Sequence, residues 1–238
     1  MTADSLYNDL AAYCVANAND EIVKKYSRYF KGGYNGWGLT KEHMDTKMAE
    51  LKKSGDLTLD LVFESAPLLM QSGRYEETSF VFSMMSMLLN QFQDKDIERL
   101  ESLFSIGISN WAHADYLGMF LLPELIKTGV LSPERMDNWV ASVYKFQRRC
   151  VPVTFIKLLR QNEDYSPLFN RLEPLMVDTE REVHQGMGWF LREAWKLNHA
   201  LTEDFLMKWK DVSPRLIFQY ACEKMKPEDK VKFKRVKI

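Results

Sequence analysis

Three segments hold the residues whose types and spacing are best suited to chemistry. They are Asn110–Asp115, Phe146–Val153 and Gln185–Glu193, and together they contain an aspartate, arginines and tryptophans. Trp111 and Asp115 are separated by one helical turn, which places both on one face of a helix. A carboxylate beside electron-rich rings can stabilise a cation, and an arginine can hold a phosphate next to it.

Two interpretations of these segments are open. In the structural one, the aspartate caps a helix, an arginine forms a salt bridge with it, and the tryptophans pack in the core. In the functional one, the same side chains converge on one substrate. Composition and spacing alone do not decide between them.

No other pattern in the chain predicts a known type of catalytic or metal site. The Gly-rich segment, residues Phe30–Gly38, is either a tight turn between helices or a loop whose backbone approaches a phosphate. It lacks the Lys-Ser/Thr ending of a P-loop, so a nucleotide site is not expected. We predict no metal site and no cofactor, because no pair of the four histidines has ligand spacing. These histidines are His43, His113, His184 and His199.

The elements that must position the three segments are predicted to be helices. Apolar residues recur at helical spacing along residues 183–194, while period-two alternation is almost absent. Helix starts are expected at Ser132–Pro133, Ser166–Pro167 and Ser213–Pro214, and Thr179 with Glu182 has the spacing of a capping box. Short connections favour antiparallel helix pairs, which stack to bury their faces. We therefore expect one all-α domain spanning residues 1–238.

Composition describes a globular chain in a reducing compartment. The 238 residues are 46% apolar, which is enough for a sizeable core. The three cysteines are odd in number and far apart, so disulfides are not expected. The formal net charge of −1 argues neither for nor against nucleic acid. With a polar start and no run of about 18 apolar residues, we predict a cytoplasmic protein with no membrane partner. We also expect the protein to be a monomer.

The three segments, in this order and spacing, resemble the AlkD family of DNA alkylation-repair glycosylases. That family has a WDxxD-type segment, a WxxR-type helix and a helix close to IGWxLRE, which here read WAHAD, FQRRCV and MGWFLRE. The stretch Arg28–Lys31 is similar to the family's RY-x-K, so the resemblance extends roughly over residues 20–200. It implies a right-handed α-α superhelix of HEAT-like antiparallel helix pairs.

The resemblance also implies roles for particular residues. The family's catalytic carboxylate corresponds to Asp115, and its site arginine to Arg149, with Arg148 as the alternative register. Two departures from the family pattern are Ala112, where the first acid of WDxxD would be, and Phe146, in place of the WxxR tryptophan. The remaining candidates for binding DNA and substrate are Trp111, Trp189, Tyr29 and Lys31.

The implied activity is hydrolysis of the N-glycosidic bond of cationic alkylated purines in duplex DNA, of the 3-methyladenine and 7-methylguanine type. Such a base excision repair enzyme would associate with the nucleoid when bound to DNA. The family grips the DNA backbone, and the lesion can stay in the base stack. The alternative is a non-catalytic HEAT-like module that binds distorted or branched DNA, or a protein partner. Ala112 and the balanced charge favour this alternative.

Overall fold

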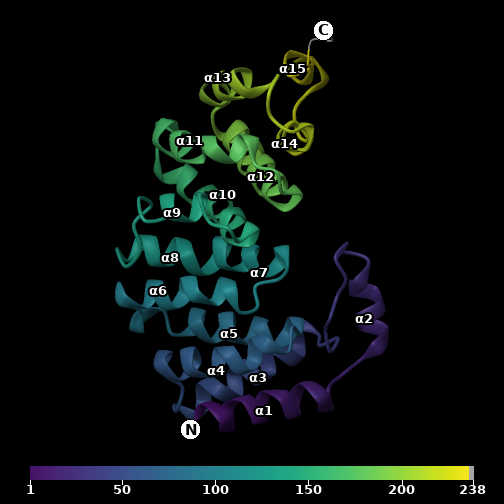
Figure 1. The fold of residues 1–238 in the computed structure, drawn as a ribbon, viewed down its shortest axis with the longest axis vertical. Coiled ribbons are helices and arrows are strands. Elements are labelled where there is room, and N and C mark those ends of the chain that lie inside the picture. Colours follow the sequence, from purple (N-terminus) through teal and green to yellow (C-terminus); the bar gives the residue numbers. More distant parts are fainter. Residues whose placement is uncertain (236–238) are drawn as a thin grey trace. The chain divides into compact units, whose positions relative to one another are not determined.

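The computed structural model describes residues 1–235, and every regular element in that range is a helix (Figure 1). No β-strand occurs among those residues, as the near absence of period-two alternation predicted. The all-α class is therefore confirmed. The superhelical arrangement of the helix pairs stays a prediction.

Contacts between residues divide the chain into two compact units. The first is Met1–His113 and the second is Ala114–Ile238, so the boundary falls inside helix α7 (Trp111–Tyr116). The prediction of a single domain over residues 1–238 stays a prediction.

The first unit is built of helices that bury apolar faces against one another. In the core of this unit α4 packs on α5 and α1 packs on α4. The connection between α4 and α5 is short, which makes these neighbours antiparallel. The helices before α7 are α1 (Ala3–Ala16), α2 (Asp20–Ser27), α3 (Lys41–Ser54), α4 (Leu59–Gln71), α5 (Tyr75–Met87), η1 (Leu89–Gln91), α6 (Lys95–Ser102) and η2 (Leu103–Ser105).

The second unit centres on its longest helix, which packs against α10 and α14. This helix, α12, buries Val183, Met187, Phe190, Leu191 and Ala194, the apolar stripe that the sequence predicted. Its helices after α7 are η3 (Leu117–Leu121, a π-helix), α8 (Leu122–Lys127), α9 (Asp137–Val140), α10 (Lys145–Leu158), η4 (Leu159–Gln161), α11 (Ser166–Leu172), η5 (Glu173–Val177), α12 (Arg181–Leu197), α13 (His199–Trp209), α14 (Arg215–Ala221) and α15 (Pro227–Lys232).

The helix starts expected at Ser166–Pro167 and Ser213–Pro214 are confirmed within a residue or two, by α11 and α14. The start expected at Ser132–Pro133 is wrong. The chain there forms successive turns, with backbone bonds between residues three apart, and α9 begins only at Asp137. Because α9 ends at Val140, Val143 lies beyond the helix and is 85% exposed.

The capping box expected at Thr179 and Glu182 is also wrong. Helix α12 begins at Arg181, and its N-cap, Glu180, makes no side-chain capping bond. The cause is Asp178, whose carboxylate accepts the backbone N–H of Glu180 at 2.7 Å. This Asx-type turn binds the backbone N–H of Glu180 just before the helix. The capping box that the spacing of Thr179 and Glu182 suggested therefore does not form.

A buried carboxylate fixes the Gly-rich segment between α2 and α3. Glu76, at the start of α5, is 2% exposed. Its side chain accepts the backbone N–H groups of Trp37 (2.8 Å), Gly38 (2.8 Å) and Leu39 (3.1 Å). It also accepts the hydroxyl of Tyr34 at 2.9 Å. These backbone donors therefore bind a side chain of the same chain and do not point at a phosphate.

The last glycine of the segment is required for this arrangement. Gly38 has a φ of 79°, in the left-handed region that side chains disfavour. A Cβ at this position would also collide with the backbone oxygen of Asn19. The segment is thus a turn between helices, one of the two interpretations that the sequence left open.

We predict that Glu76→Gln lowers the free energy of unfolding by about 1–3 kcal/mol. An amide has a single oxygen to accept bonds, and its NH₂ group would face backbone N–H donors. Urea denaturation of the purified protein measures the effect. The matched control is Glu21→Gln, because the Glu21 side chain is 82% exposed in an ion pair with Lys24. Equal losses for the two variants would contradict an anchoring role for Glu76.

Candidate functional site

Asp115 and Arg149 form a two-bond ion pair within the second unit. Arg149 donates from Nε to Oδ1 at 2.8 Å and from Nη2 to Oδ2 at 2.9 Å. Only 6% of the arginine side chain and 15% of the aspartate side chain are exposed. Arg149 also donates from Nη1 to the backbone oxygen of Glu182 at 2.5 Å. One guanidinium therefore connects α7, α10 and α12.

The environment of Asp115 acts on its protonation in two directions. Burial raises the pKa of Asp115 above its ordinary value of 3.8, and the hydrogen bonds and charge of Arg149 oppose that rise. Both carboxylate oxygens accept N–H donors, which is the pattern of the ionised form. The result is a largely desolvated carboxylate that retains some exposure.

Glycines allow α10 to approach closely enough to form this pair. A Cβ on Gly118, in the π-helix η3, would be 2.7 Å from Cγ1 of Val153 on α10. A Cβ on Gly186, in α12, would be 3.2 Å from Cγ of Arg149. Helix α10 therefore packs against two backbones that carry no side chain at the contact, which fixes where Arg149 lies.

Arg148, the alternative register, lies in a different ion pair. It donates from Nε to Asp178 at 2.6 Å and from Nη2 to the other Asp178 oxygen at 3.2 Å. Its Nη1 donates to the backbone oxygen of Ser142 at 2.7 Å. The structure thus brings Arg149, and not Arg148, to Asp115.

Trp111 belongs to an aromatic cluster in the first unit. Its ring stacks on Phe30 with centroids 5.4 Å apart and planes 21° apart. Phe30 lies 5.0 Å from the ring of Tyr34, which lies 5.4 Å from that of Tyr75. We define the aromatic cluster as these four residues. The sequence named its tryptophan but missed the other three, of which Phe30 and Tyr34 lie in the Gly-rich segment.

Tyr29 and Lys31 are both exposed, and Tyr29 to the extent of 60%. The ring that reaches Trp111 is that of Phe30, which is adjacent to both in sequence. The implied roles of Tyr29 and Lys31 stay predictions.

Trp189 is half-buried on α12. One turn earlier on the same helix, Gln185 donates to the hydroxyl of Tyr220 on α14 at 2.7 Å. One turn later, Arg192 forms ion pairs with Glu193 and Glu223. The exposed face of α12 thus presents a tryptophan between polar groups that already have partners.

The start of α7 is fixed by a network around His113. Asn110 accepts the backbone N–H groups of Ala112 (3.0 Å) and His113 (3.1 Å), as an N-cap does. Its amide nitrogen lies 2.9 Å from Nδ1 of His113, while Nε2 lies 3.0 Å from the backbone oxygen of Tyr75. Since the Asn110 amide donates to Nδ1, the imidazole is neutral with its proton on Nε2. An Asn directly before Trp111 is the sequence signal for this cap.

Within residues 1–235, no group of three His, Cys, Asp or Glu side chains has the geometry to hold a metal ion. In the same range, no helix combines the length and the apolar character that crossing a membrane requires. The three cysteines are free thiols.

Comparison with known proteins adds two findings. The sequence model of the family described as DNA alkylation repair enzyme matches residues 13–225. Among solved structures, a protein described as a predicted DNA alkylation repair enzyme from Enterococcus faecalis superposes with a TM-score of 0.75. It is 14% identical, and the match covers 89% of this chain and 98% of that one, which shows a shared fold. The search of curated proteins gave no match.

Burial of His113 predicts a loss of stability in mild acid. Burial lowers the pKa of His113 from 6.5 to about 4. Between these values the unfolded chain binds a proton that the folded chain does not, so the free energy of unfolding falls as pH decreases from about 6.5 to about 4. The expected loss is about 3 kcal/mol. Urea denaturation across this range, compared with His113→Gln, measures it. Parallel stability curves for the two proteins would refute the assignment of a neutral buried imidazole.

Proposed function

Because the chain belongs to the family of DNA alkylation repair enzymes, we propose that it is a DNA glycosylase acting on cationic alkylated purines in duplex DNA. Family membership gives it a role in DNA repair. The reaction class rests on one observation, the partly exposed carboxylate of Asp115 held by two bonds from Arg149. The proposed lesions are of the 3-methyladenine and 7-methylguanine type.

The charge of the lesion explains why one carboxylate suffices. Cleavage of an N-glycosidic bond develops positive charge on the sugar, as in other glycoside hydrolyses. A purine alkylated at N3 or N7 already carries a positive charge and leaves without protonation. The carboxylate of Asp115 then stabilises the sugar cation and positions the attacking water. The water oxygen bonds to the anomeric carbon, the base departs as a neutral molecule with the bonding electrons, and the proton lost by the water passes to the solvent.

Arg149 acts in this scheme mainly through Asp115. Arg149 is 5% exposed, and its guanidinium donates to both Asp115 and the Glu182 backbone. It therefore orients the carboxylate toward substrate, while the implied contact with a DNA phosphate stays a prediction. Trp111 and Trp189, which are half-buried, would offer ring faces to the cationic base, each such contact contributing about 0.5–2 kcal/mol.

A second function, a non-catalytic module that binds distorted DNA or a protein, is favoured by a different observation. Arg148 and Arg149, the two registers that the sequence offered for the site arginine, are both in ion pairs with carboxylates, and so is Arg192 on α12. Ala112 also removes the first acid of the family pattern. An Asp115–Arg149 pair that serves only stability would have the same geometry. A measurement of activity is therefore needed to distinguish the two functions.

We predict that Asp115→Asn lowers the single-turnover rate of methylated-purine release by about 10²–10³-fold, as removal of one electrostatic stabiliser does. Asn keeps the shape of the side chain but removes the charge that stabilises the sugar cation. It also leaves the charge of Arg149 unpaired, so some stability is lost. Excision from methylated duplex DNA and thermal melts are measured on the same samples.

Asp178→Asn is the matched control for this experiment. The substitution breaks the ion pair between Asp178 and Arg148. That pair is buried to a degree similar to that of the Asp115–Arg149 pair, and its arginine also lies on α10. The control is expected to lose comparable stability and keep its excision rate. Equal rate losses would assign the effect to folding or to the Arg148 register. A wild-type chain that releases no cationic base would favour the non-catalytic module over the glycosylase.

The raised pKa of Asp115 predicts an acid limb in the pH profile of excision. The reaction needs the ionised carboxylate, so below this pKa the rate falls about tenfold per pH unit. Because burial raises the pKa, the limb lies at a higher pH than an ordinary aspartate would give. Single-turnover rates, corrected for spontaneous depurination, are compared at pH values where circular dichroism shows a folded chain. A flat profile down to the ordinary pKa of 3.8 would contradict the role of Asp115.

A further inference from the structure

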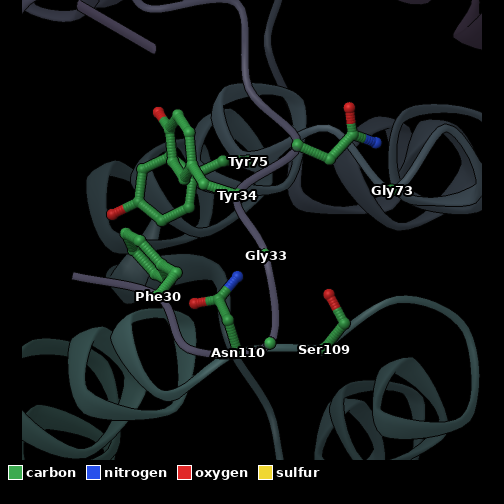
Figure 2. A pocket seen from close by; sticks show the side chains of 9 residues that line it. Phe30, Gly33, Tyr34, Gly73, Tyr75, Ser109 and Asn110 are labelled. Carbon is green, nitrogen blue, oxygen red and sulfur yellow. The ribbon is translucent and has the colours of Figure 1, made fainter. Parts of the chain in front are cut away.

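A cavity of about 350 Å³ lies in the first unit, and the proposed reaction does not use it. It is bounded by the Gly-rich segment, by the turn before α5 and by the chain entering α7. Figure 2 shows the rings of Phe30, Tyr34 and Tyr75 gathered on one side, with Asn110 and Ser109 below them. One wall is therefore aromatic and another is polar.

Existing contacts hold these walls in place before any ligand arrives. The ring of Phe30 stacks on Trp111, and the hydroxyl of Tyr34 is bonded to the buried carboxylate of Glu76. Asn110 is fixed as the cap of α7 by two backbone N–H groups. A ligand would thus meet side chains that need little ordering, which reduces the entropy lost on binding.

Some polar atoms around the cavity remain available. The Ser109 hydroxyl is exposed and has no hydrogen-bond partner among residues 1–235. The side-chain oxygen of Asn35 also has no hydrogen-bond partner in that range. The bond to the backbone oxygen of Ser72 is made by the amide nitrogen of Asn35. Asn110 retains the second hydrogen of its amide nitrogen. The cavity therefore offers both donors and acceptors in addition to aromatic rings.

The lining contains no Lys, Arg, Asp or Glu side chain. A phosphate would find no counter-charge there, so a nucleotide bound through its phosphate does not fit. The volume lies at the lower end of the roughly 300–1,000 Å³ usual for small-molecule pockets. Aromatic rings, uncharged donors and acceptors, and a small volume are the features that recognise a planar heterocycle.

We propose that this cavity binds a single nucleobase that has left the base stack. The base is either free in solution, as after excision, or unstacked while still attached to a DNA strand. Only the origin of the base rests on the proposed glycosylase function, because binding itself requires no catalysis. The site lies wholly in the first unit, whereas Asp115 and Arg149 lie in the second.

Gly32 provides the sharpest test. It lines the cavity, a Cβ built on it meets no atom within 4 Å, and its φ is outside the left-handed region. A side chain at position 32 thus meets open space beside the cavity without backbone strain, so Gly32→Leu is designed to narrow the cavity, and Gly32→Ala is the matched control that leaves most of the space. Calorimetric titration of the full chain with adenine and with 3-methyladenine should give a dissociation constant of about 1 mM or lower. Ribose 5-phosphate should not bind.

Gly32→Leu is expected to weaken binding of the free bases at least tenfold, and Gly32→Ala less than threefold. Asn35→Leu, which removes one acceptor from an exposed side chain, is expected to weaken it severalfold, and it serves if Gly32→Leu fails to fold. Absence of base binding by the wild type, or unchanged affinity in the folded Gly32→Leu and Asn35→Leu variants, overturns the proposal.

A second titration identifies the source of the base. Duplexes with one unpaired nucleotide are compared with fully paired duplexes, for wild type and Gly32→Leu. A preference for the unpaired site that Gly32→Leu abolishes supports capture of a base still attached to DNA. Binding of free bases with no such preference supports capture of the excised base. Asp115→Asn should bind bases like wild type, so the loss of excision and the loss of base binding are separable results.

Discussion

The ion pair between Asp115 and Arg149 is the constraint on which the second unit depends. Both charges are largely removed from water, and each would be costly to bury alone. Breaking such a pair from one side typically costs about 3–5 kcal/mol. The carboxylate comes from α7, the guanidinium from α10, and the remaining acceptor from the backbone of α12. Any packing of these helices that separates the two charges is therefore strongly disfavoured.

Buried carboxylates that accept several hydrogen bonds also lie where other loops meet helices. Glu76 accepts hydrogen bonds from backbone N–H groups of the Gly-rich segment. Asp178, in the turn before α12, forms an ion pair with Arg148. Each buried acid satisfies polar groups that the fold would otherwise leave unpaired, so acidic residues determine how loops join helices. Two adjacent arginines of α10, Arg148 and Arg149, are each paired with a buried carboxylate in this way.

Helices could be predicted from the sequence because their signal is local. The apolar stripe from Val183 to Ala194 gave α12, and Ser-Pro pairs marked α11 and α14. The start at Ser132 failed because consecutive turns use the same residues as a helix cap, and the outcome depends on where α9 packs. Local spacing carries no information about such packing.

The candidate site could be predicted only in part, for the same reason. The resemblance predicted roles for Asp115 and Arg149, but the adjacent Arg148 could also be aligned with the arginine of the family motif. Only the rotation of α10 about its axis decides which of the two arginines contacts α7. That Phe30, and not its neighbour Tyr29, stacks on Trp111 depends on the path of the Gly-rich segment, which Glu76 fixes from α5. The π-helix after α7 has no distinctive sequence pattern at all.

The π-helix η3 contains one of the two glycines that affect the position of the Asp115–Arg149 ion pair. Gly118 follows Asp115 by three residues, so both lie on the side of the helix that faces α10. The absent side chain lets α10 come so close that a Cβ would be 3.2 Å from the backbone oxygen of Cys150, the residue after Arg149. On the other flank, Gly186 leaves room for the aliphatic part of Arg149. A helix held on both sides by backbone has little freedom to shift. The close packing at these two glycines therefore limits the separation of carboxylate and guanidinium, so the packing and the ion pair favour the same arrangement of the helices.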